Sequence, residues 1–271
     1  MASKLIPSNP EAVTVIREVV PGTIVTSSAP FLRYGRIKIG GRGTIVRMQN
    51  GALAVFSPTA LTEELKSKVD SMGEVKYITA LDYEHHIFLG PWYKEYPNAK
   101  VLGPEGLPEK RQKQSNENVP FAVVFEPSKK HEIKVDPEFD AEFEYEYVHA
   151  HANKEIVFNH KPTKTLIQAD LIFNMPATEQ HSRLGDAQPG FLTKFFSLFT
   201  NLQGEAIGHR RFLWYMASKP DRAAFNESVA RINSWDFERM IPCHGDVIEK
   251  EGKTAFQKVM KWHLDAALKK Q

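Results

Sequence analysis

The chain has very little cysteine and almost no excess of charge of either sign. Cys243 is the single cysteine among 271 residues, so an internal disulfide and a zinc site built from several thiolates are excluded. The 35 basic residues nearly balance the 33 acidic residues, which leaves a formal net charge of +2. A balanced chain has no general electrostatic attraction for nucleic acid or for an anionic membrane. We therefore expect no nucleic-acid partner and no membrane partner.

Long apolar runs are also missing. The apolar stretches are far shorter than the ~20 residues that a membrane-spanning helix needs. Residues 1–10 contain a lysine and two prolines but no apolar run of the length found in signal peptides. These absences predict a cytoplasmic protein. Since 42% of the residues are hydrophobic and 25% are charged, the composition is that of a globular chain with a sizeable core. We expect one domain over residues 1–271, with a helical part from about residue 190.

Short β-rich segments dominate the first half of the chain. Residues 44–48 and 53–56 are separated by Asn50 and Gly51, a pair typical of tight hairpins. Alternating aromatic and acidic residues predict a further strand over residues 139–148. The other strands that we expect cover residues 75–80, 155–158, 165–169 and 239–242. The helices that we expect cover residues 62–69, 88–96, 191–202, 210–218, 221–234 and 253–270. This pattern is typical of a layered α/β sandwich, in which sites are built from loops at strand ends.

Metal-binding residue types follow several of these strands. The first expected strand of this kind leads into residues 82–86, which contain Asp82, Glu84, His85 and His86. His151 and Asp170 accompany a second group of strands, and His244 follows the last strand. Imidazole and carboxylate ligands suit zinc, and also iron or manganese. A single histidine near a strand end is usually structural, but the repeated pattern favours a metal site.

The order and the residues of these motifs resemble those of the metallo-β-lactamase superfamily, in a divergent branch close to the DUF4336 proteins. The similarity extends over roughly residues 12 to 250, and no single motif is specific, whereas their order and spacing together are. The similar segments are the hairpin over residues 44–58, residues 81–89 with their histidine pair, residues 151–158, residues 164–170 and the Ile-Pro-Cys-His-Gly motif at 241–245. The resemblance implies a four-layer αββα sandwich.

One motif departs from the superfamily pattern. The superfamily carries His-x-His-x-Asp-His after a strand, and this chain has Ala80 and Asp82 where the first two histidines would stand. Glu84 then takes the place of the aspartate, and His85 takes the place of the last histidine. Moving the alignment by one residue makes His86 the last histidine and still leaves the first two positions without one. The resemblance therefore implies one divalent metal ion rather than two, with zinc expected and iron or manganese as alternatives.

The resemblance also selects a ligand set. The acidic residue of the first motif, His85 or His86, Asp170 and His244 would form the better-preserved subsite. His151 would contribute to the other subsite, with Asp82 as a further candidate. A closed structural site with four ligands stays open as an alternative. The candidate metal ligands are thus His85, His86, His151, Asp170 and His244.

A metal-dependent hydrolase is the function that this pattern favours. A metal ion lowers the pKa of a bound water from about 15.7 towards ~7 and polarises a carbonyl or phosphoryl oxygen. Asp82, Glu84 and Asp170 are the candidate catalytic carboxylates, which would orient this water or accept its proton. The resemblance implies a small ester, lactone or thioester as the small-molecule substrate. Two alternatives stay open: a non-catalytic binding protein that retains the fold, and a metal-dependent oxidoreductase or lyase.

Simpler interpretations apply to the other histidines and to one aromatic run. His131, His160, His181 and His263 lie among charges or on expected helix surfaces, so we expect them to be solvated. The phenylalanines of residues 191–199 follow a helical spacing that favours core or dimer packing over the lining of an apolar channel. A homodimer therefore stays open. The basic run at residues 209–211 could bind an anionic substrate group or be a plain surface patch, so the substrate-binding residues are unknown from the sequence.

Overall fold

The computed structural model describes residues 9–115, 119–184 and 190–269. The larger of its two main sheets has seven strands. In spatial order these are β1 (Val15–Val20), β2 (Ile24–Ala29), β5 (Gly41–Arg47), β6 (Leu53–Phe56), β7 (Val75–Thr79), β8 (Lys100–Pro104) and β9 (Phe121–Phe125). The second sheet consists of β10 (Phe143–Val148), β11 (Glu155–His160), β12 (Thr165–Gln168) and β13 (Arg239–Pro242). A small hairpin of β3 (Leu32–Arg33) and β4 (Ile37–Lys38) stands apart from both sheets.

The helices flank these sheets in chain order. They are α1 (Pro10–Val13), α2 (Glu63–Met72), α3 (Leu89–Glu95), α4 (Leu107–Ser115), α5 (Pro137–Glu142), α6 (Phe191–Ser197), α7 (Ile207–Phe212), α8 (Arg222–Ser234) and α9 (Gly252–Leu268). A 3-10 segment, η4 (Glu179–Leu184), precedes α6, and a π-helical turn, Leu213–Ala217, follows α7. The described part of the chain contains no helix that is long and apolar enough to cross a membrane.

Local sequence signals explain the first hairpin and the first long helix. β5 pairs with β6 in antiparallel register around the Asn50-Gly51 turn, where Gly51 has a positive φ of 87°, so the predicted hairpin is confirmed. The side chain of Thr62 accepts a hydrogen bond from the Leu65 amide and thereby caps α2, which ends at Gly73. The predicted strands over 75–80, 155–158, 165–169 and 239–242 correspond to β7, β11, β12 and β13.

The prediction for residues 139–148 was only half right. Residues 143–148 form β10, but Pro137–Glu142 form α5. The Asp136 carboxylate caps this helix by accepting a hydrogen bond from the Phe139 amide. Asp136 followed by Pro137 is a helix-start signal, and here it outweighs the alternation that indicates a strand. Two predicted helices are also shorter or less regular, because α6 ends at Ser197 and a π-helical turn follows α7.

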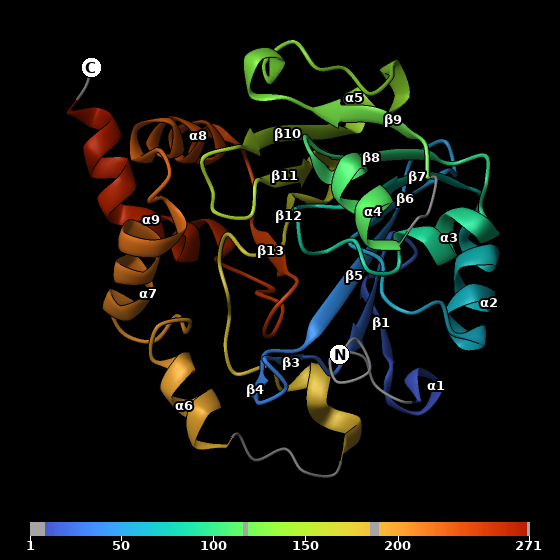
Figure 1. Cartoon of the computed structure of the whole chain (residues 1–271), viewed down its shortest axis with the longest axis horizontal. Helices are drawn as coiled ribbons and strands as arrows, with labels where there is room; N and C mark the ends of the chain where they lie inside the picture. Colours follow the sequence, from blue (N-terminus) through green and yellow to red (C-terminus); the bar gives the residue numbers. More distant parts are fainter. Residues whose placement is uncertain (1–8, 116–118, 185–189, 270–271) are drawn as a thin grey trace.

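Three of the four apolar clusters among the described residues form layers, which make the molecule an αββα sandwich. Phe56, Tyr77, Phe158 and Ile241 belong to the cluster between the two sheets. α2 and α3 cover the outer face of the larger sheet, and α7, α8 and α9 cover the outer face of the smaller one. Figure 1 shows the two groups of helices on opposite sides of the sheets. The expected fold class is confirmed.

The strand directions place several loops at one edge of this sandwich. β6, β7 and β8 run parallel to one another, and β12 runs parallel to β13. The carboxyl ends of parallel strands meet at the same edge of a sheet. The segments that follow β7, β12 and β13 contain His85, Asp170 and His244 respectively. The topology therefore brings residues far apart in the sequence to one place.

Candidate metal centre

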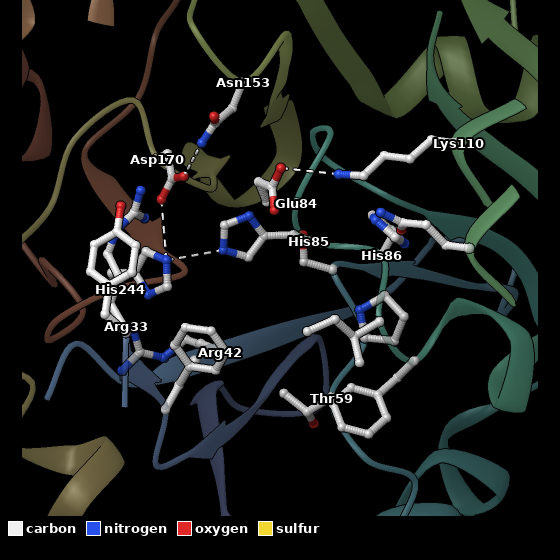
Figure 2. Close-up of a pocket in the computed structure, with 18 residues that line it drawn as sticks. Arg33, Arg42, Thr59, Glu84, His85, His86, Lys110, Asn153, Asp170 and His244 are labelled. Atoms are coloured by element: carbon white, nitrogen blue, oxygen red, sulfur yellow. Dashed lines mark hydrogen bonds and ion pairs between the residues drawn. The ribbon is translucent and has the colours of Figure 1, made fainter. Parts of the chain in front are cut away.

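Three side chains meet where the loops after β7, β12 and β13 come together. His85 Nε2 lies 3.0 Å from His244 Nε2, which lies 3.1 Å from Asp170 Oδ1. Among the described residues, these three form the histidine, cysteine or carboxylate group whose ligand atoms all lie within 4.8 Å of one another. Figure 2 shows the three side chains converging, joined by dashed lines. Asp170 and His244 are buried, and His85 is partly buried.

The outer hydrogen bonds fix how the two imidazoles are protonated. His244 Nδ1 donates to the carbonyl oxygen of Gly40 at 2.7 Å, and His85 Nδ1 donates to the Asp82 carboxylate at 2.9 Å. In each neutral ring the other nitrogen, Nε2, then carries a lone pair. Both lone pairs face each other and the Asp170 oxygen, so three acceptor atoms meet without a donor between them. Only a proton or a metal cation can make such an arrangement favourable.

The Asp170 carboxylate supports this interpretation. Its Oδ2 accepts a hydrogen bond from Asn153 Nδ2 at 2.5 Å, whereas its buried Oδ1 faces His244 Nε2 at 3.1 Å and accepts no hydrogen bond from any other described residue. A buried carboxylate oxygen without a donor is costly unless a cation lies next to it. A tetrahedral zinc ion with bonds of ~2.0–2.1 Å separates its ligand atoms by ~3.3 Å, which is close to the two distances measured here. The donor set therefore fits a divalent metal ion.

The pKa values of the surrounding groups also indicate that a cation is stabilised at this centre. Burial opposes the protonation of His85, but the Asp82 and Asp170 carboxylates outweigh it and raise the pKa of His85 to about 10. Burial by itself would raise the pKa of Asp170, yet the imidazoles of His85 and His244 lower it below its ordinary value. A proton thus occupies the cluster when no metal is bound. Metal binding would release this proton.

Asp82 orients the His85 ring from the side that faces away from His244. Its carboxylate is fully buried and accepts hydrogen bonds from the amides of Glu84 and His85, both at 2.7 Å, as well as from the His85 ring. These bonds fold residues 82–85 into a tight turn that directs His85 towards His244. Carboxylates that orient a ligating histidine in this way are common in metal sites.

The adjacent histidine has a different environment. His86 Nδ1 accepts a hydrogen bond from Arg111 at 3.1 Å, and the His86 carbonyl accepts another at 2.6 Å. Burial, together with the charges of Lys110 and Arg111, lowers the pKa of His86 to about 4. His86 lines the cavity but lies outside the group of three.

His151 and Glu84 also lie near the centre without joining the group of three. His151 is buried, and its Nδ1 accepts a hydrogen bond from the Asn153 amide at 3.2 Å. Burial lowers its pKa, although the Asp170 and Asp82 carboxylates act in the opposite direction. The Glu84 side chain is 59% exposed and pairs with Lys110 at 3.0 Å on the cavity wall. Figure 2 shows this pair to one side of His85.

Several supporting residues were missed by the sequence analysis. Glu155 is buried and accepts hydrogen bonds from the amides of Ala169 (2.7 Å) and Asp170 (2.9 Å). Burial and the nearby carboxylates of Asp82 and Asp170 raise its pKa well above the ordinary value. Asn153 and Glu155 both belong to the segment that resembles the superfamily, so their polarity next to His151 was an available signal.

Arg42 is another supporting residue that the sequence analysis missed, and no sequence motif indicates its role. It is fully buried on β5 and donates to the carbonyl oxygens of Pro242 (2.8 Å) and Gly245 (2.6 Å). These bonds tie the His244 loop of one sheet to a strand of the other. Gly40, whose carbonyl orients His244, directly precedes the same strand. Backbone acceptors of this kind leave no trace in a sequence.

Most of the histidines expected to be solvated are in fact buried. His160, His181 and His263 are each at most 4% exposed, whereas His131 is exposed. His263 Nδ1, for example, lies 2.7 Å from the side-chain oxygen of Asn226 between two helices. Burial lowers the pKa of His263 to about 3. These histidines fill core space in their neutral form and are not part of the centre.

A cavity of about 610 Å³ opens onto the three converging side chains. Aromatic and aliphatic residues line one part of its wall, and charged residues line another. Those lining residues include Phe31, Tyr34, Ile87, Arg33, Lys110 and Glu84. Its volume is in the range of sites for small molecules. Two histidines and one carboxylate beside such a cavity resemble catalytic metal sites with an open ligand position more than closed structural sites.

The fold and this site define a protein of the metallo-β-lactamase fold. A metallo-β-lactamase from Pontibacter korlensis is 13% identical, with 95% of this chain and 100% of that chain covered and a TM-score of 0.56. A metallo-β-lactamase from Pseudomonas aeruginosa in its mono-zinc form is 12% identical, with 99% and 100% covered and a TM-score of 0.56. A flavo di-iron protein variant from Thermotoga maritima is 10% identical, with 92% of this chain and 62% of that chain covered and a TM-score of 0.56.

The chain belongs to the DUF4336 family, described as a domain of unknown function, whose model matches residues 34–194. The resemblance seen in the sequence is therefore confirmed. No curated protein is significantly similar to the chain in sequence. The low identities to the solved structures establish a common fold, and they leave the activity to be argued from the site itself.

Proposed function

We propose that this protein is a metal-dependent hydrolase that holds one divalent ion, with zinc as the expected metal, through His85, Asp170 and His244. The observation that carries the proposal is the convergence of three potential ligand atoms, His85 Nε2, His244 Nε2 and Asp170 Oδ1, at 3.0 and 3.1 Å. His86 and His151 lie outside this ligand set in the proposal, because neither joins the group of three.

The neighbouring residues would prepare the ligands. Asp82 holds the His85 ring, the Gly40 carbonyl holds His244, and Asn153 holds the second oxygen of Asp170. Each bond leaves one lone pair directed at the centre, so little rearrangement is needed on metal binding. A divalent ion held there would lower the pKa of a bound water towards ~7 and polarise a substrate carbonyl.

The three candidate carboxylates would then have different roles. Asp170 is a ligand, and Asp82 is a positioning residue because its oxygens already accept several hydrogen bonds. Glu84 is the carboxylate on the cavity wall, where it pairs with Lys110. Glu84 is therefore the proposed proton acceptor, and Lys110 restrains its position.

The substrate proposed is a small ester, lactone or thioester. The size of the cavity supports a small molecule, and the mixture of apolar and charged wall residues supports one with both apolar and polar parts. Hydrolysis of a simple aryl ester and of an aliphatic lactone by the metal-loaded protein would test this class. Activity that is equal in wild type and in His244→Ala would contradict it.

Metal content is the decisive measurement for the site. Elemental analysis of the purified wild-type protein should give one equivalent of metal, whereas His244→Ala and Asp170→Asn should each lower the metal affinity at least about tenfold. His131→Ala is the matched control, because His131 is exposed and outside the centre. Metal content that is the same in all four proteins would place the metal elsewhere.

Iron chemistry is the second candidate function. Two histidines and one carboxylate beside an open cavity are also the donor set of non-haem iron(II) oxygenases. Iron as the bound metal, together with turnover that depends on dioxygen, would favour an oxidoreductase over a hydrolase. Zinc as the bound metal, together with ester hydrolysis, would exclude the oxidoreductase. A protein that binds no metal would be the non-catalytic alternative.

A further inference from the structure

The outward side of α6 is strongly apolar. Phe191 is 81% exposed, Leu198 just beyond the helix is 63% exposed, and Leu192, Phe195 and Phe199 are also exposed. The rings of Phe195 and Phe199 pack against each other on this surface, with centroids 5.5 Å apart. Exposed apolar residues are ordinary when scattered, but a contiguous aromatic group of this kind marks an interaction site.

The helix cannot turn this side inward, because its other side is already anchored. Thr193 is buried and its hydroxyl accepts a hydrogen bond from the Lys38 amide at 3.0 Å. Phe196 packs edge-on against the buried Phe173, with centroids 5.9 Å apart. The exposed phenylalanines therefore belong to the folded state and are not a core left unpacked.

Cationic residues lie on α6 itself and on the hairpin that packs beside it. Arg33, Arg36 and Lys194 belong to segments 31–38 and 190–204, which contain no acidic residue. The next residue, Glu205, is acidic and pairs with Arg210. β4 packs beside α6, where the Lys38 amide bonds to Thr193, so the β3–β4 hairpin flanks the helix. Arg36 and Lys194 have no ion pair with any described residue, and Arg33 stacks over Tyr34 at 5.3 Å. A chain of balanced total charge thus has a locally basic face.

We propose that this face, defined by Tyr34, Arg36, Phe191, Lys194, Phe195, Leu198 and Phe199, docks on the surface of an anionic lipid bilayer. Exposed aromatic and leucine side chains would enter the headgroup boundary, while the cations would contact lipid phosphates. The whole-chain charge predicts no membrane partner, but it averages over this local excess.

The charge of this face favours an anionic bilayer over a second copy of the chain as the binding partner. In a two-fold symmetric dimer across this face, each Lys194 and Arg36 would approach cations of the partner copy, and no acidic residue of the two segments could neutralise them. Like charges brought together at an interface are costly. Anionic headgroups supply the opposite charge, so the lipid surface is the better match.

The docking face continues into the wall of the cavity. Tyr34 is 78% exposed and also lines the cavity, together with Phe31 and Arg33. Docking would therefore bring the mouth of the cavity to the lipid boundary. The proposal does not depend on metal binding, because it rests on α6 and the β3–β4 hairpin.

Co-sedimentation of the full-length protein with lipid vesicles tests the proposal. The protein should bind vesicles of equal parts phosphatidylglycerol and phosphatidylcholine, and it should bind pure phosphatidylcholine more weakly. Phe191→Ser with Phe195→Ser should weaken binding at least about tenfold. Arg36→Gln with Lys194→Gln should cost about fivefold per cation on anionic vesicles only, and high salt should reproduce this loss.

Leu268→Ser is the matched control, since Leu268 is 69% exposed at the far end of α9. It should bind vesicles as the wild type does, and all variants should keep the wild-type unfolding temperature because the changed side chains are exposed. Absence of vesicle binding in the wild type would overturn the proposal. So would a wild-type dimer that the double phenylalanine variant converts to a monomer, because the face would then be an interface between two copies.

Discussion

At the scale of single residues, the position after His244 shows how tightly the centre is built. Gly245 has a φ of +87°, and a methyl group at its Cα would lie 2.1 Å from the carbonyl oxygen of Asn174. The Gly245 amide donates to Gln180 and its carbonyl accepts from Arg42. Glycine is required here both for its backbone conformation and for this close approach, and its neighbour His244 depends on it.

Gly245→Ala should therefore lower the free energy of unfolding by at least about 3 kcal/mol, because the strain of a left-handed backbone adds to the clash. Metal affinity should fall as well. Gly22→Ala is the control, since Gly22 has a φ of +68° but open space around it, and it should cost about 1 kcal/mol. Denaturant unfolding measures both, and equal losses would show that the contact with Asn174 is unimportant.

The sequence nominated five metal ligands, and the structure brings three of them together. The difference lies in local geometry that residue types do not encode. His85 and His86 are adjacent, and the turn held by Asp82 decides which of them faces His244. The orienting carbonyl of Gly40 belongs to the backbone, so no residue type could have indicated it.

At the scale of elements, segments with strong local signals were predicted, whereas strands β8 and β9 and the short helices α4 and α5 were missed. The hairpin around Gly51 and helix α2 carry strong local signals, and both were predicted. α5 was missed because Phe139 to Phe143 alternate as a strand would, while the cap at Asp136 directs the chain into a helix. Tyr77 and Lys100, from neighbouring strands, also bond to Asp136, and such contacts do not exist until the sheet has formed.

Asp136 should accordingly make a pH-dependent contribution to stability. Burial opposes its ionisation, but the bonds from Lys100, the Phe139 amide and Tyr77 lower its pKa to about 2. A lowered pKa contributes stability above the unfolded value of ~4 and loses it as the pH falls through 2. Asp136→Asn keeps the cap and should lower the free energy of unfolding by about 2 kcal/mol at pH 7.

This difference between wild type and Asp136→Asn should shrink as the pH falls from about 5 to about 2. Denaturant titrations over that range measure it. Asp265→Asn serves as the control, because Asp265 is exposed and pairs with the exposed Lys261, and it should change stability by less than about 0.5 kcal/mol at any pH. A difference that does not vary with pH would contradict the lowered pKa.

At the scale of the whole molecule, the candidate centre lies across the seam between the two sheets. His85 follows a strand of the larger sheet, whereas Asp170 and His244 follow strands of the smaller sheet. The Arg42 bonds to Pro242 and Gly245 cross the same seam. A ligand of all three residues would therefore couple both sheets.

Adding metal should raise the unfolding temperature of the entire chain in one cooperative transition. At a free metal concentration of about 100 times Kd, the gain should be about 2.7 kcal/mol. Scanning calorimetry of the chelated and the metal-loaded protein measures it, and His244→Ala should show no gain. Two separate transitions, of which metal shifts only one, would show that the centre does not link the sheets.

The same seam has a consequence for the order of events during synthesis. The two histidines that face each other are 159 positions apart in the chain. Gly40 and His244, which its carbonyl orients, are 204 positions apart. While the ribosome is still making the second half, His85 has no companion ligands. The centre can thus assemble only after the last strand, β13, has joined its sheet, so the proposed metal uptake would be a late step that marks a completed fold.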